Sequence, residues 1–444
     1  MHADPIGIIL LIGTFFLLLL LRVPVAFALG IPCVLTAWYL GLPLMIVSQQ
    51  MAKGLNSFSL MAIPFFILAG QLMGVGGISQ RMIDMANVFV GRIRGGLAMV
   101  NILASMFFGG ISGSSVADTS SIGSILIPMM KKAGYDNDYS VAVTITSSVQ
   151  GVIIPPSHNV IIYALAAGWV SVTINGITQQ FSLSIGKLFL AGVVPGVFLG
   201  LMLMVISYYL AVKRGYPKEP PISFREGVRK ILDGILGVMT AVIIIGGVVS
   251  GIFTATESAA IAVAYAFLVT WLVYHEITWK NLQAVLFDSL KTLAIVVALI
   301  TTSSAYSYLM TRLDIPRLVT ESLIQLTDNR YLIFLIVNVI LLFLGMIMDM
   351  APLILIITPI LLPVVASFGM DPHHFGIVMM INLGIGLLTP PVGSTLFVGC
   401  AIGRIRIEEM VKPLVPFYLT MLITLLLITY IPEISLWLPN LLTK

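Results

Sequence analysis

The stretch GVIIPPSHN at residues 151–159 decides the fold of this chain, because it interrupts a long apolar run with two consecutive prolines. Proline lacks a backbone N–H and its ring displaces the preceding turn, so a helix breaks there and frees carbonyl oxygens one turn earlier. A second stretch, GLLTPPVGST at residues 386–395, carries the same interruption. Both stretches predict a helix divided into two halves with polar backbone at the break.

The two breaks belong to a longer internal repeat. Pro155-Pro156 lies 235 residues before Pro390-Pro391, and the same offset aligns the flanking sequence without a gap. The matched positions are mostly residues that shape the backbone: Gly110 with Gly345, Pro128 with Pro363, Gly134 with Gly369, Asp136 with Asp371, Gly151 with Gly386, and Gly168 with Gly403. Matches at such special positions indicate two related structural units.

The composition places these units in a membrane. Of the 444 residues, 59% are hydrophobic and 9% are charged, whereas an ordinary soluble domain has about 25% charged residues. The net charge of +4 does not indicate nucleic-acid binding, since the basic residues fall in short loops between apolar runs, where they set topology. Cys33 and Cys400 lie far apart in apolar segments and are interpreted as packing residues, not as a disulfide or metal pair.

The apolar runs predict an all-α integral membrane protein with about ten spanning helices. Two further apolar stretches, 95–128 and 331–364, are too long for one span and are broken by Gly, Ser or Pro. We predict that each is a re-entrant hairpin, because the loop Lys213–Lys230 can then be cytoplasmic with most other basic residues. Both termini then face the periplasm, and the two repeats are inverted relative to each other, as in secondary transporters.

The predicted organisation has five parts. They are N-terminal scaffold helices (1–57), a first repeat (58–186) with hairpin 95–128 and broken helix 139–168, central scaffold helices (187–288), an inverted second repeat (289–412) with hairpin 331–364 and broken helix 375–403, and a C-terminal scaffold helix (413–444). Segments 78–94 and 312–330 have the mixed pattern of amphipathic helices. The polar stretch 170–184 predicts an external loop or a small hairpin.

Oxygen-bearing residues collect at the hairpin tips and breaks. A desolvated Na⁺ prefers oxygen ligands and would satisfy the carbonyls that proline frees, while half-helix N-termini suit an anion. One acid accompanies each tip, Asp118 in the first and Asp349 in the second, and an acid inside a membrane costs roughly 2.5–3.5 kcal/mol on insertion scales. The hydroxyl and amide residues at these places are Ser112, Ser114, Ser115, Thr119, Asn159, Ser394 and Thr395.

Several polar residues have structural interpretations beside functional ones. Any single Ser or Thr could bond its own helix backbone, and small residues and proline kinks also serve packing. Glu257 fits a helix cap better than an ion ligand. Arg312 could extend to the interface or hold a substrate carboxylate, and His158 could hydrogen-bond within the break or relay protons. The sequence has no nucleophile–base set, phosphate loop or metal cluster, so an enzyme is not predicted.

Four motifs carry a family resemblance: GGISGSSVADTSSIGSILIPMM (109–130), GVIIPPSHNVIIYA (151–164), GIFTATESAA (251–260) and GLLTPPVGSTLFVG (386–399). With them the chain resembles the large permease subunit of TRAP transporters, the DctM family, over nearly its whole length. The resemblance implies an elevator mechanism, Na⁺ as coupling ion without any other cofactor, a small four-helix membrane subunit and a periplasmic substrate-binding protein. It also implies a location in the bacterial inner membrane.

The resemblance also implies site residues. A first Na⁺ site would use Ser112, Ser114 and Asp118 with the break from Pro155 to Asn159. A second would use Asp349 with the break from Thr389 to Thr395, which includes Gly393. The substrate would lie between them, against Ser114, Ser115, Asn159, Ser394 and Thr395, with Arg312 as a carboxylate partner. Two departures from the family are the long polar stretch 170–184 and His158 in the first break.

The functional prediction is Na⁺-coupled import of a small carboxylate delivered by a binding protein, with C4-dicarboxylates, sialic acid and keto acids all open. One alternative is a binding-protein-independent ion–carboxylate symporter or antiporter of the same architecture. Another is a non-transporting membrane scaffold, which would have no need of matched Pro-Pro breaks or of Asp118.

Overall fold

The computed structural model describes residues 4–56, 58–174, 177–180 and 183–442, and the described chain is almost entirely helical. The first half contains α1 (Pro5–Ile8), a π-helical turn (Ile9–Gly13), α2 (Thr14–Leu20), α3 (Val25–Tyr39), α4 (Met45–Leu55), a short 3₁₀ turn (Phe58–Met61), α5 (Ala62–Val75), α6 (Ile78–Val90), α7 (Gly96–Ser112), α8 (Ser115–Lys132), α9 (Asn137–Ser147), α10 (Gln150–Ile153) and α11 (His158–Ala167).

The second half begins with a long helix and then repeats this order. It contains α12 (Ile185–Arg214), α13 (Phe224–Val249), α14 (Ala255–Leu268) with a π-helical turn (Val269–Val273), α15 (Trp279–Arg312), α16 (Ile315–Leu326), α17 (Arg330–Gly345), α18 (Met350–Ser367), α19 (Pro372–Gly386), α20 (Ser394–Gly403), α21 (Ile407–Tyr430) and α22 (Glu433–Leu442). Helices α18 and α19 begin 235 residues after α8 and α9, which confirms the offset read from the sequence.

Both predicted hairpins and both broken helices are present. The hairpins are the pairs α7–α8 and α17–α18, and the broken helices are α9–α11 and α19–α20. The peptide bonds Pro155-Pro156 and Pro390-Pro391 are both cis, and the chain turns by 47° across the first break. The hairpins and the broken helices therefore occur where the glycines and the Pro-Pro pairs of the sequence predict them.

One end of the molecule gathers basic loops, and we call it the basic face. The Gly95 amide donates to the Pro217 carbonyl (3.1 Å), and Asn137 donates to the Gly403 carbonyl (2.9 Å), so four loops meet there. The first hairpin opens toward this end. The loops and helix ends at this face carry a set of cations: Arg92, Arg94, Lys131, Lys132, Arg214, Lys218 and Arg404.

The second hairpin opens toward the other end, which we call the opposite face. There the Tyr163 hydroxyl donates to the Pro372 carbonyl (2.6 Å), and the Tyr430 hydroxyl donates to the Tyr331 carbonyl (2.8 Å). Because α17 begins and α18 ends at this face, the second hairpin enters from the side opposite to the first. The inverted arrangement is thus a property of the structure as well as of the charge pattern.

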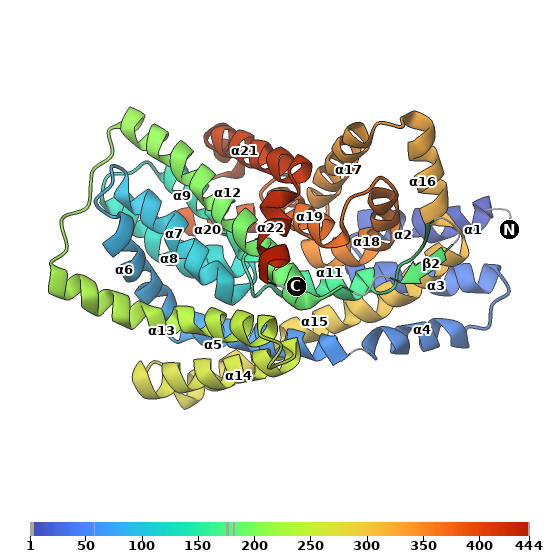
Figure 1. The fold of residues 1–444 in the computed structure, drawn as a ribbon, viewed down its shortest axis with the longest axis horizontal. Coiled ribbons are helices and arrows are strands. Elements are labelled where there is room, and N and C mark those ends of the chain that lie inside the picture. The colour runs from blue at the N-terminus through green and yellow to red at the C-terminus, as the bar shows by residue number, and fades with distance from the viewer. Residues whose placement is uncertain (1–3, 57, 175–176, 181–182, 443–444) are drawn as a thin grey trace.

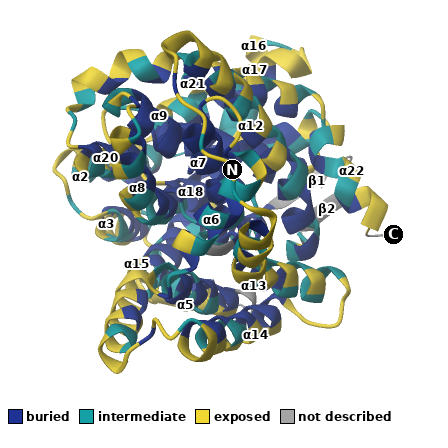
Figure 2. Ribbon diagram, turned by 90° about the vertical axis from the view of Figure 1, so that its left-hand side faces the viewer, coloured by how far each residue is buried: buried dark blue, intermediate teal, exposed yellow. Residues whose placement is uncertain are grey.

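The helices form a core and an outer layer. In Figure 1, α4, α5, α13, α14 and α15 lie along one side, and the hairpins and broken helices lie beside them. Figure 2 shows the buried residues concentrated around α7, α18 and α12. Large apolar side chains such as Phe27, Trp38 and Val205 remain exposed, at 64%, 75% and 67%, as expected for a surface that contacts lipid.

Six of the described helices are long and apolar enough to cross a membrane, and up to eight if each bent helix pair counts as one span. Five shorter apolar helices accompany them within the described part of the chain. The count of about ten spans therefore remains a prediction, while the all-helical, multi-span class is confirmed. Helices α6 and α16 are the two amphipathic connectors predicted before the hairpins.

The polar stretch 170–184, for which the sequence predicts an external loop or a small hairpin, contains a small hairpin. Strands β1 (Ser171–Ile174) and β2 (Ile177–Gln180) pair antiparallel, with Ser171 opposite Gln180; residues 175–176 and 181–182 lie outside the described part of the chain. At the equivalent place in the second repeat, α20 ends at Gly403 and α21 begins at Ile407. The β-hairpin is therefore an insertion into the first repeat only.

Candidate functional site

Each hairpin tip is pressed against the break of its own repeat through glycines. A Cβ added at Gly109 would lie 2.6 Å from the Cα of Gly151, and one added at Gly386 would lie 2.6 Å from the carbonyl carbon of Gly345. Real Cβ atoms do not tolerate such distances. Glycine at both positions of each pair lets the hairpin arm and the broken helix touch through their backbones, which brings tip and break together.

The first tip turns at Gly113, which has a left-handed backbone (φ +61°). A Cβ there would lie 3.2 Å from the backbone nitrogen of His158 and from the carbonyl oxygen of Pro156. The next residue, Ser114, is extended and caps α8 by accepting a hydrogen bond from the Ala117 amide (3.3 Å). The tip therefore sits directly on the first break.

At the second tip, Asp349 has an extended backbone and occupies the N-cap position of α18. The Ser394 hydroxyl donates to its carboxylate (3.4 Å) from the start of α20. Asp349 lies 235 residues after Ser114, so the equivalent cap positions of the two repeats hold a hydroxyl and an acid. Asp118 has Leu353 as its equivalent, so the two acids are not symmetry mates.

One cavity of about 630 Å³ joins both tips and both breaks. The first repeat contributes Ser112, Ser114, Ser115, His158 and Asn159, and the second contributes Asp349, Met350, Ala351, Leu387 and Ser394. The outer layer closes the cavity with residues of α5 and α15, among them Gln71 and Thr292. Neither of those two residues is predicted from the sequence. Gln71 could have been noticed as an amide inside an apolar helix, whereas Thr292 gives no signal.

Four helices begin at this cavity. Lining residues lie at the N-terminal ends of α8, α11, α18 and α20. The N-terminal turn of a helix has unpaired N–H groups and carries a partial positive charge, so each of these ends favours an anion. No lysine or arginine of the described residues lines the cavity. The partial positive charge that an anion would meet in the cavity therefore comes from these backbone helix ends.

Some predicted residues lie behind the cavity wall. Thr395 is fully buried and donates to the Ser115 hydroxyl (3.0 Å), which is also bonded to Ser148 (2.8 Å). This bond joins the two repeats directly. Thr389 donates to the Ile385 carbonyl of its own helix (2.8 Å), which is the local bonding that the sequence left open for any Ser or Thr.

Three other predicted residues are also placed at the tips and breaks. Asn159 lines the cavity and donates to the Gly113 carbonyl across the first tip (3.4 Å). Gly393 precedes α20 with a positive φ of 32°. The carbonyl of Pro155 faces Gly110, where an added Cβ would lie 2.9 Å from it.

Two predicted residues lie away from the cavity. Arg312 is the last residue of α15, thirteen positions beyond the lining residue Leu299, which is about 20 Å along a helix. Its side chain cannot span that distance in this structure. Asp118 is fully buried and is also absent from the lining residues.

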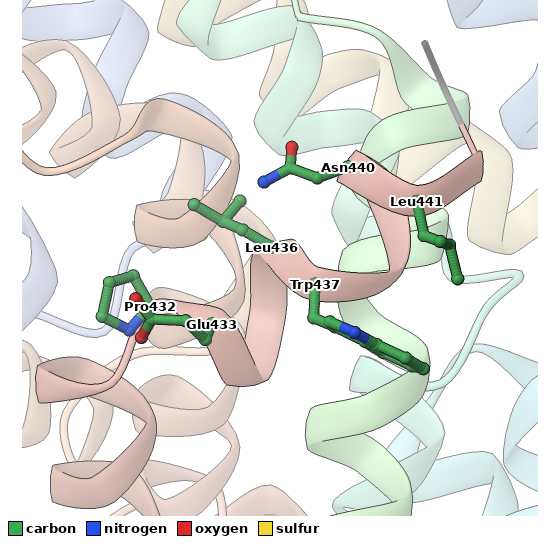
Figure 3. Close-up of a pocket in the computed structure, with 6 residues that line it drawn as sticks. All are labelled: Pro432, Glu433, Leu436, Trp437, Asn440 and Leu441. Atoms are coloured by element: carbon green, nitrogen blue, oxygen red, sulfur yellow. The ribbon is translucent and has the colours of Figure 1, made fainter.

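Two further features are settled by the structure. Glu257 accepts from the Thr254 amide (2.8 Å) and its own amide donates to the Thr254 hydroxyl (3.2 Å), so it forms the predicted cap of α14. A separate hollow of about 400 Å³ runs along α22 and is lined by Pro432, Glu433, Leu436, Trp437, Asn440 and Leu441 (Figure 3). Its lining residues come from α22 and the proline before it, and none of them belongs to a hairpin tip.

Comparison with known proteins agrees with this architecture. Residues 12–434 match the family described as "Tripartite ATP-independent periplasmic transporter, DctM component". The chain belongs to the DctM family. The permease is therefore a transport component and not an enzyme, and the resemblance noted in the sequence is confirmed.

Individual relatives cover almost the whole permease. It is 42% identical over 438 residues to an uncharacterized protein YgiK of Salmonella typhimurium, covering 98% of this chain and 97% of the relative. It is 37% identical to the C4-dicarboxylate TRAP transporter large permease protein DctM of Rhodobacter capsulatus, covering 98% and 99%. The fold resembles the Alcanivorax borkumensis YdaH transporter (TM-score 0.65, 15% identity, covering 98% and 100%).

Proposed function

We propose that the permease imports a small organic acid across the bacterial inner membrane together with Na⁺, and that the cavity between the two tips is the transport site. The observation that carries this proposal is the convergence of four helix N-termini on one cavity. A carboxylate there receives N–H donors and helix dipoles without needing a fixed cation. The hydroxyl and amide side chains of Ser114, Ser115 and Asn159 add donors in the first half of the cavity.

The second half of the cavity suits the coupling ion. Asp349 is the only acidic lining residue among those described, and the Ser394 hydroxyl lies beside it. A cation bound here would neutralise Asp349, which otherwise repels the substrate carboxylate. In the first half, the hydroxyls of Ser112 and Ser114 and the carbonyl of Pro156 supply oxygens for a further ion. Sodium and substrate would then bind cooperatively.

The arrangement of layers supports an elevator-type movement. The cavity lies where the hairpins and broken helices meet α5 and α15 of the outer layer. Sliding the core along that layer would expose the cavity first to one side and then to the other. We place the basic face in the cytoplasm, following the distribution of Lys and Arg, so that the β1–β2 insertion lies on the periplasmic side.

The proposed partners are a small membrane subunit and a periplasmic substrate-binding protein. Reconstitution in liposomes tests the proposal. The permease with both partners should take up a radiolabelled acid, from a panel that includes a C4-dicarboxylate and sialic acid, only when an inward Na⁺ gradient is present. Uptake of equal rate in Na⁺-free buffer under a proton gradient would refute sodium coupling.

Omitting the binding protein separates this proposal from its main alternative. A self-sufficient ion–carboxylate symporter would transport without that protein, whereas the proposed system should be inactive without it. A matched preparation that lacks only the small membrane subunit shows whether that subunit is also required.

A further inference from the structure

A second pocket lies at the basic face, outside the transport cavity. It has a volume of about 660 Å³. Its lining includes Ile93 and Arg94 from the loop between α6 and α7, Tyr208 from α12, and Pro217 and Lys218 from the loop between α12 and α13. None of these residues lines the cavity between the hairpin tips. The pocket is therefore a separate feature of the fold.

Backbone hydrogen bonds hold the two loops of this pocket against each other. The Gly95 amide donates to the Pro217 carbonyl (3.1 Å), and the Glu219 amide donates to the Gly91 carbonyl (3.2 Å). Gly95 also lets the first loop approach α12, because its backbone is left-handed (φ +74°) and a Cβ there would collide with the Cβ of Ala211. The charged residue that adjoins these bonds in each loop is thereby held at the same pocket.

Those two charged residues, Arg94 and Lys218, have no partner within the protein. Both are exposed, and neither side chain has an ion pair or a hydrogen bond among the described residues. The neighbouring Arg214, by contrast, pairs with Asp136 (2.8 Å). Glu219 follows Lys218 in the chain but is not a lining residue, and no other acid of the described residues lines the pocket. Two uncompensated positive charges in one hollow favour an anion.

An exposed apolar stripe of α12 leads to the pocket. Leu201, Val205, Tyr208 and Val212 follow one another at intervals of three and four residues, so they lie on one face of the helix, and all four are exposed. Tyr208 is also a lining residue. Because α12 is long and apolar enough to cross a membrane, this stripe suits contact with lipid acyl chains. The pocket thus lies where that surface meets the basic loops.

We propose that this pocket binds the phosphate headgroup of an anionic phospholipid, with Arg94 and Lys218 on the phosphate and the acyl chains along the α12 stripe. Arginine and lysine donate charge-assisted hydrogen bonds to phosphate oxygens. A tyrosine at the boundary has an apolar ring for the acyl region and a hydroxyl for the headgroup. The proposal does not rest on the transport function, because none of the residues involved lines the transport cavity.

Two other anions fit the surroundings of the pocket less well. A free phosphate ion would use the two cations but would leave the adjoining apolar stripe without a contact. An acidic peptide segment would place its polar backbone against that stripe, where only the Tyr208 hydroxyl can hydrogen-bond. A phospholipid matches both parts, since its charged end and its apolar end are joined in one molecule.

The melting temperature of the purified permease in an uncharged detergent tests the proposal. Dioleoyl phosphatidylglycerol should raise Tm in a saturable manner, and dioleoyl phosphatidylcholine, which has the same chains but no net charge, should raise it much less. The double variant Arg94→Gln/Lys218→Gln should need about 10- to 30-fold more phosphatidylglycerol for half of the shift, because two cations near an anionic lipid contribute an affinity factor of that order.

The control variant is Arg225→Gln/Lys280→Gln, which removes the same charge from two exposed residues outside the pocket. It should respond to phosphatidylglycerol as the wild type does. An equal loss of response in both double variants would attribute the effect to net charge and overturn the proposal. A shift of equal size with sodium phosphate or with soluble hexaglutamate would also overturn it, since neither contains acyl chains.

Native mass spectrometry supplies a readout that does not depend on thermal stability. The wild type and the single variant Arg94→Gln are each released from nanodiscs that contain phosphatidylglycerol and phosphatidylcholine in equal amounts. The wild type should retain at least one phosphatidylglycerol molecule that the variant loses. Equal retention by the two proteins would show that Arg94 does not hold the headgroup and would refute the assignment of this pocket.

Discussion

The two repeats share a backbone plan but differ in chemistry at equivalent positions. The cap position of the first hairpin is Ser114 and that of the second is Asp349, which lines the cavity. One turn further along, the first repeat has the enclosed Asp118 and the second has Leu353. Duplicated structure therefore supplies two tips, and only the second presents an acid to the cavity.

The helices that lead into the two hairpins, α6 and α16, differ in their ion pairs. In the first repeat, Arg81 of α6 stacks on the Tyr274 ring (3.7 Å) and pairs with Glu276 (3.7 Å), while Asp84 pairs with Lys230 of α13 (3.7 Å). In the second repeat, Arg317 pairs with Asp314 and Glu321, both within or beside its own helix α16. The first connector is tied to the outer layer, whereas the ion pairs of the second, among the described residues, stay within α16 and its N-cap.

The largest expected effect comes from making the second tip resemble the first. Asp349→Ser should reduce Na⁺-dependent uptake about 10- to 100-fold, because a charge-assisted contact contributes roughly 1.5–3 kcal/mol. The half-saturating Na⁺ concentration should rise in reconstituted liposomes. The control is Asp371→Asn, an acid of the same repeat outside the cavity. Unchanged Na⁺ dependence in Asp349→Ser would remove the distinction between the tips.

The close glycine contacts between each hairpin and its broken helix predict how much stability a Gly→Ala substitution costs at each place. Gly386→Ala should destabilise the permease by about 1–3 kcal/mol, the usual range for overpacking, since its Cβ would meet backbone at 2.6 Å. Gly151→Ala should cost less, because its nearest contact is 3.2 Å. Gly246→Ala on α13, with nothing within 4 Å, is the control. Thermal unfolding in detergent measures all three, and equal losses at Gly386 and Gly246 would contradict the backbone contact.

The connectors predict a smaller difference. Arg81→Ala should lower stability by about 1 kcal/mol through the lost cation–π contact and ion pair, and should speed hydrogen exchange in α6. Arg317→Ala, with its side chain 67% exposed, should change stability by less than about 0.5 kcal/mol. If both variants behave alike, the first connector is not held more firmly than the second.

The smallest effect concerns Asp136 at the basic face. Hydrogen bonds from Tyr216 and Arg214, together with the Arg214 charge, outweigh partial burial and lower the pKa of this carboxyl. A lowered pKa in the folded state stabilises the fold above the unfolded value of about 4, and the contribution is lost as the pH falls through the folded value. Tyr216→Phe should therefore reduce the stability difference between pH 6 and pH 3. The Asp371 cap, whose pKa His373 lowers despite burial, should be unaffected.

The sequence predicted the parts of the site that depend on local backbone chemistry. Pro155-Pro156, Pro390-Pro391 and the repeated glycines predicted both breaks and both hairpins, because these residues act on their own turn of chain. Where a residue lies relative to the site was harder to predict when it depends on how a helix is rotated or how far it extends. The sequence predicts Asp118 at the tip because it follows Ser114 by one turn, but its side chain is buried in the core beside Ser105 of α7.

Arg312 shows the same limitation along a helix axis. Its position after an apolar run was clear from the sequence, but its distance from the tips depends on how α15 packs, and α15 continues well past the cavity. Thr292 illustrates the reverse case, a lining residue that only the packed structure reveals.

The hydrogen bond between Thr395 and Ser115 has a consequence for how the two repeats would move during transport. It connects the first turns of α20 and α8, which belong to different repeats, and both residues are at most 1% exposed. The two tips are thereby hydrogen-bonded to each other, so the elevator-type movement proposed above would carry both halves of the cavity together. Ion and substrate bound in such a cavity would reach each side of the membrane at the same time, which would link their transport.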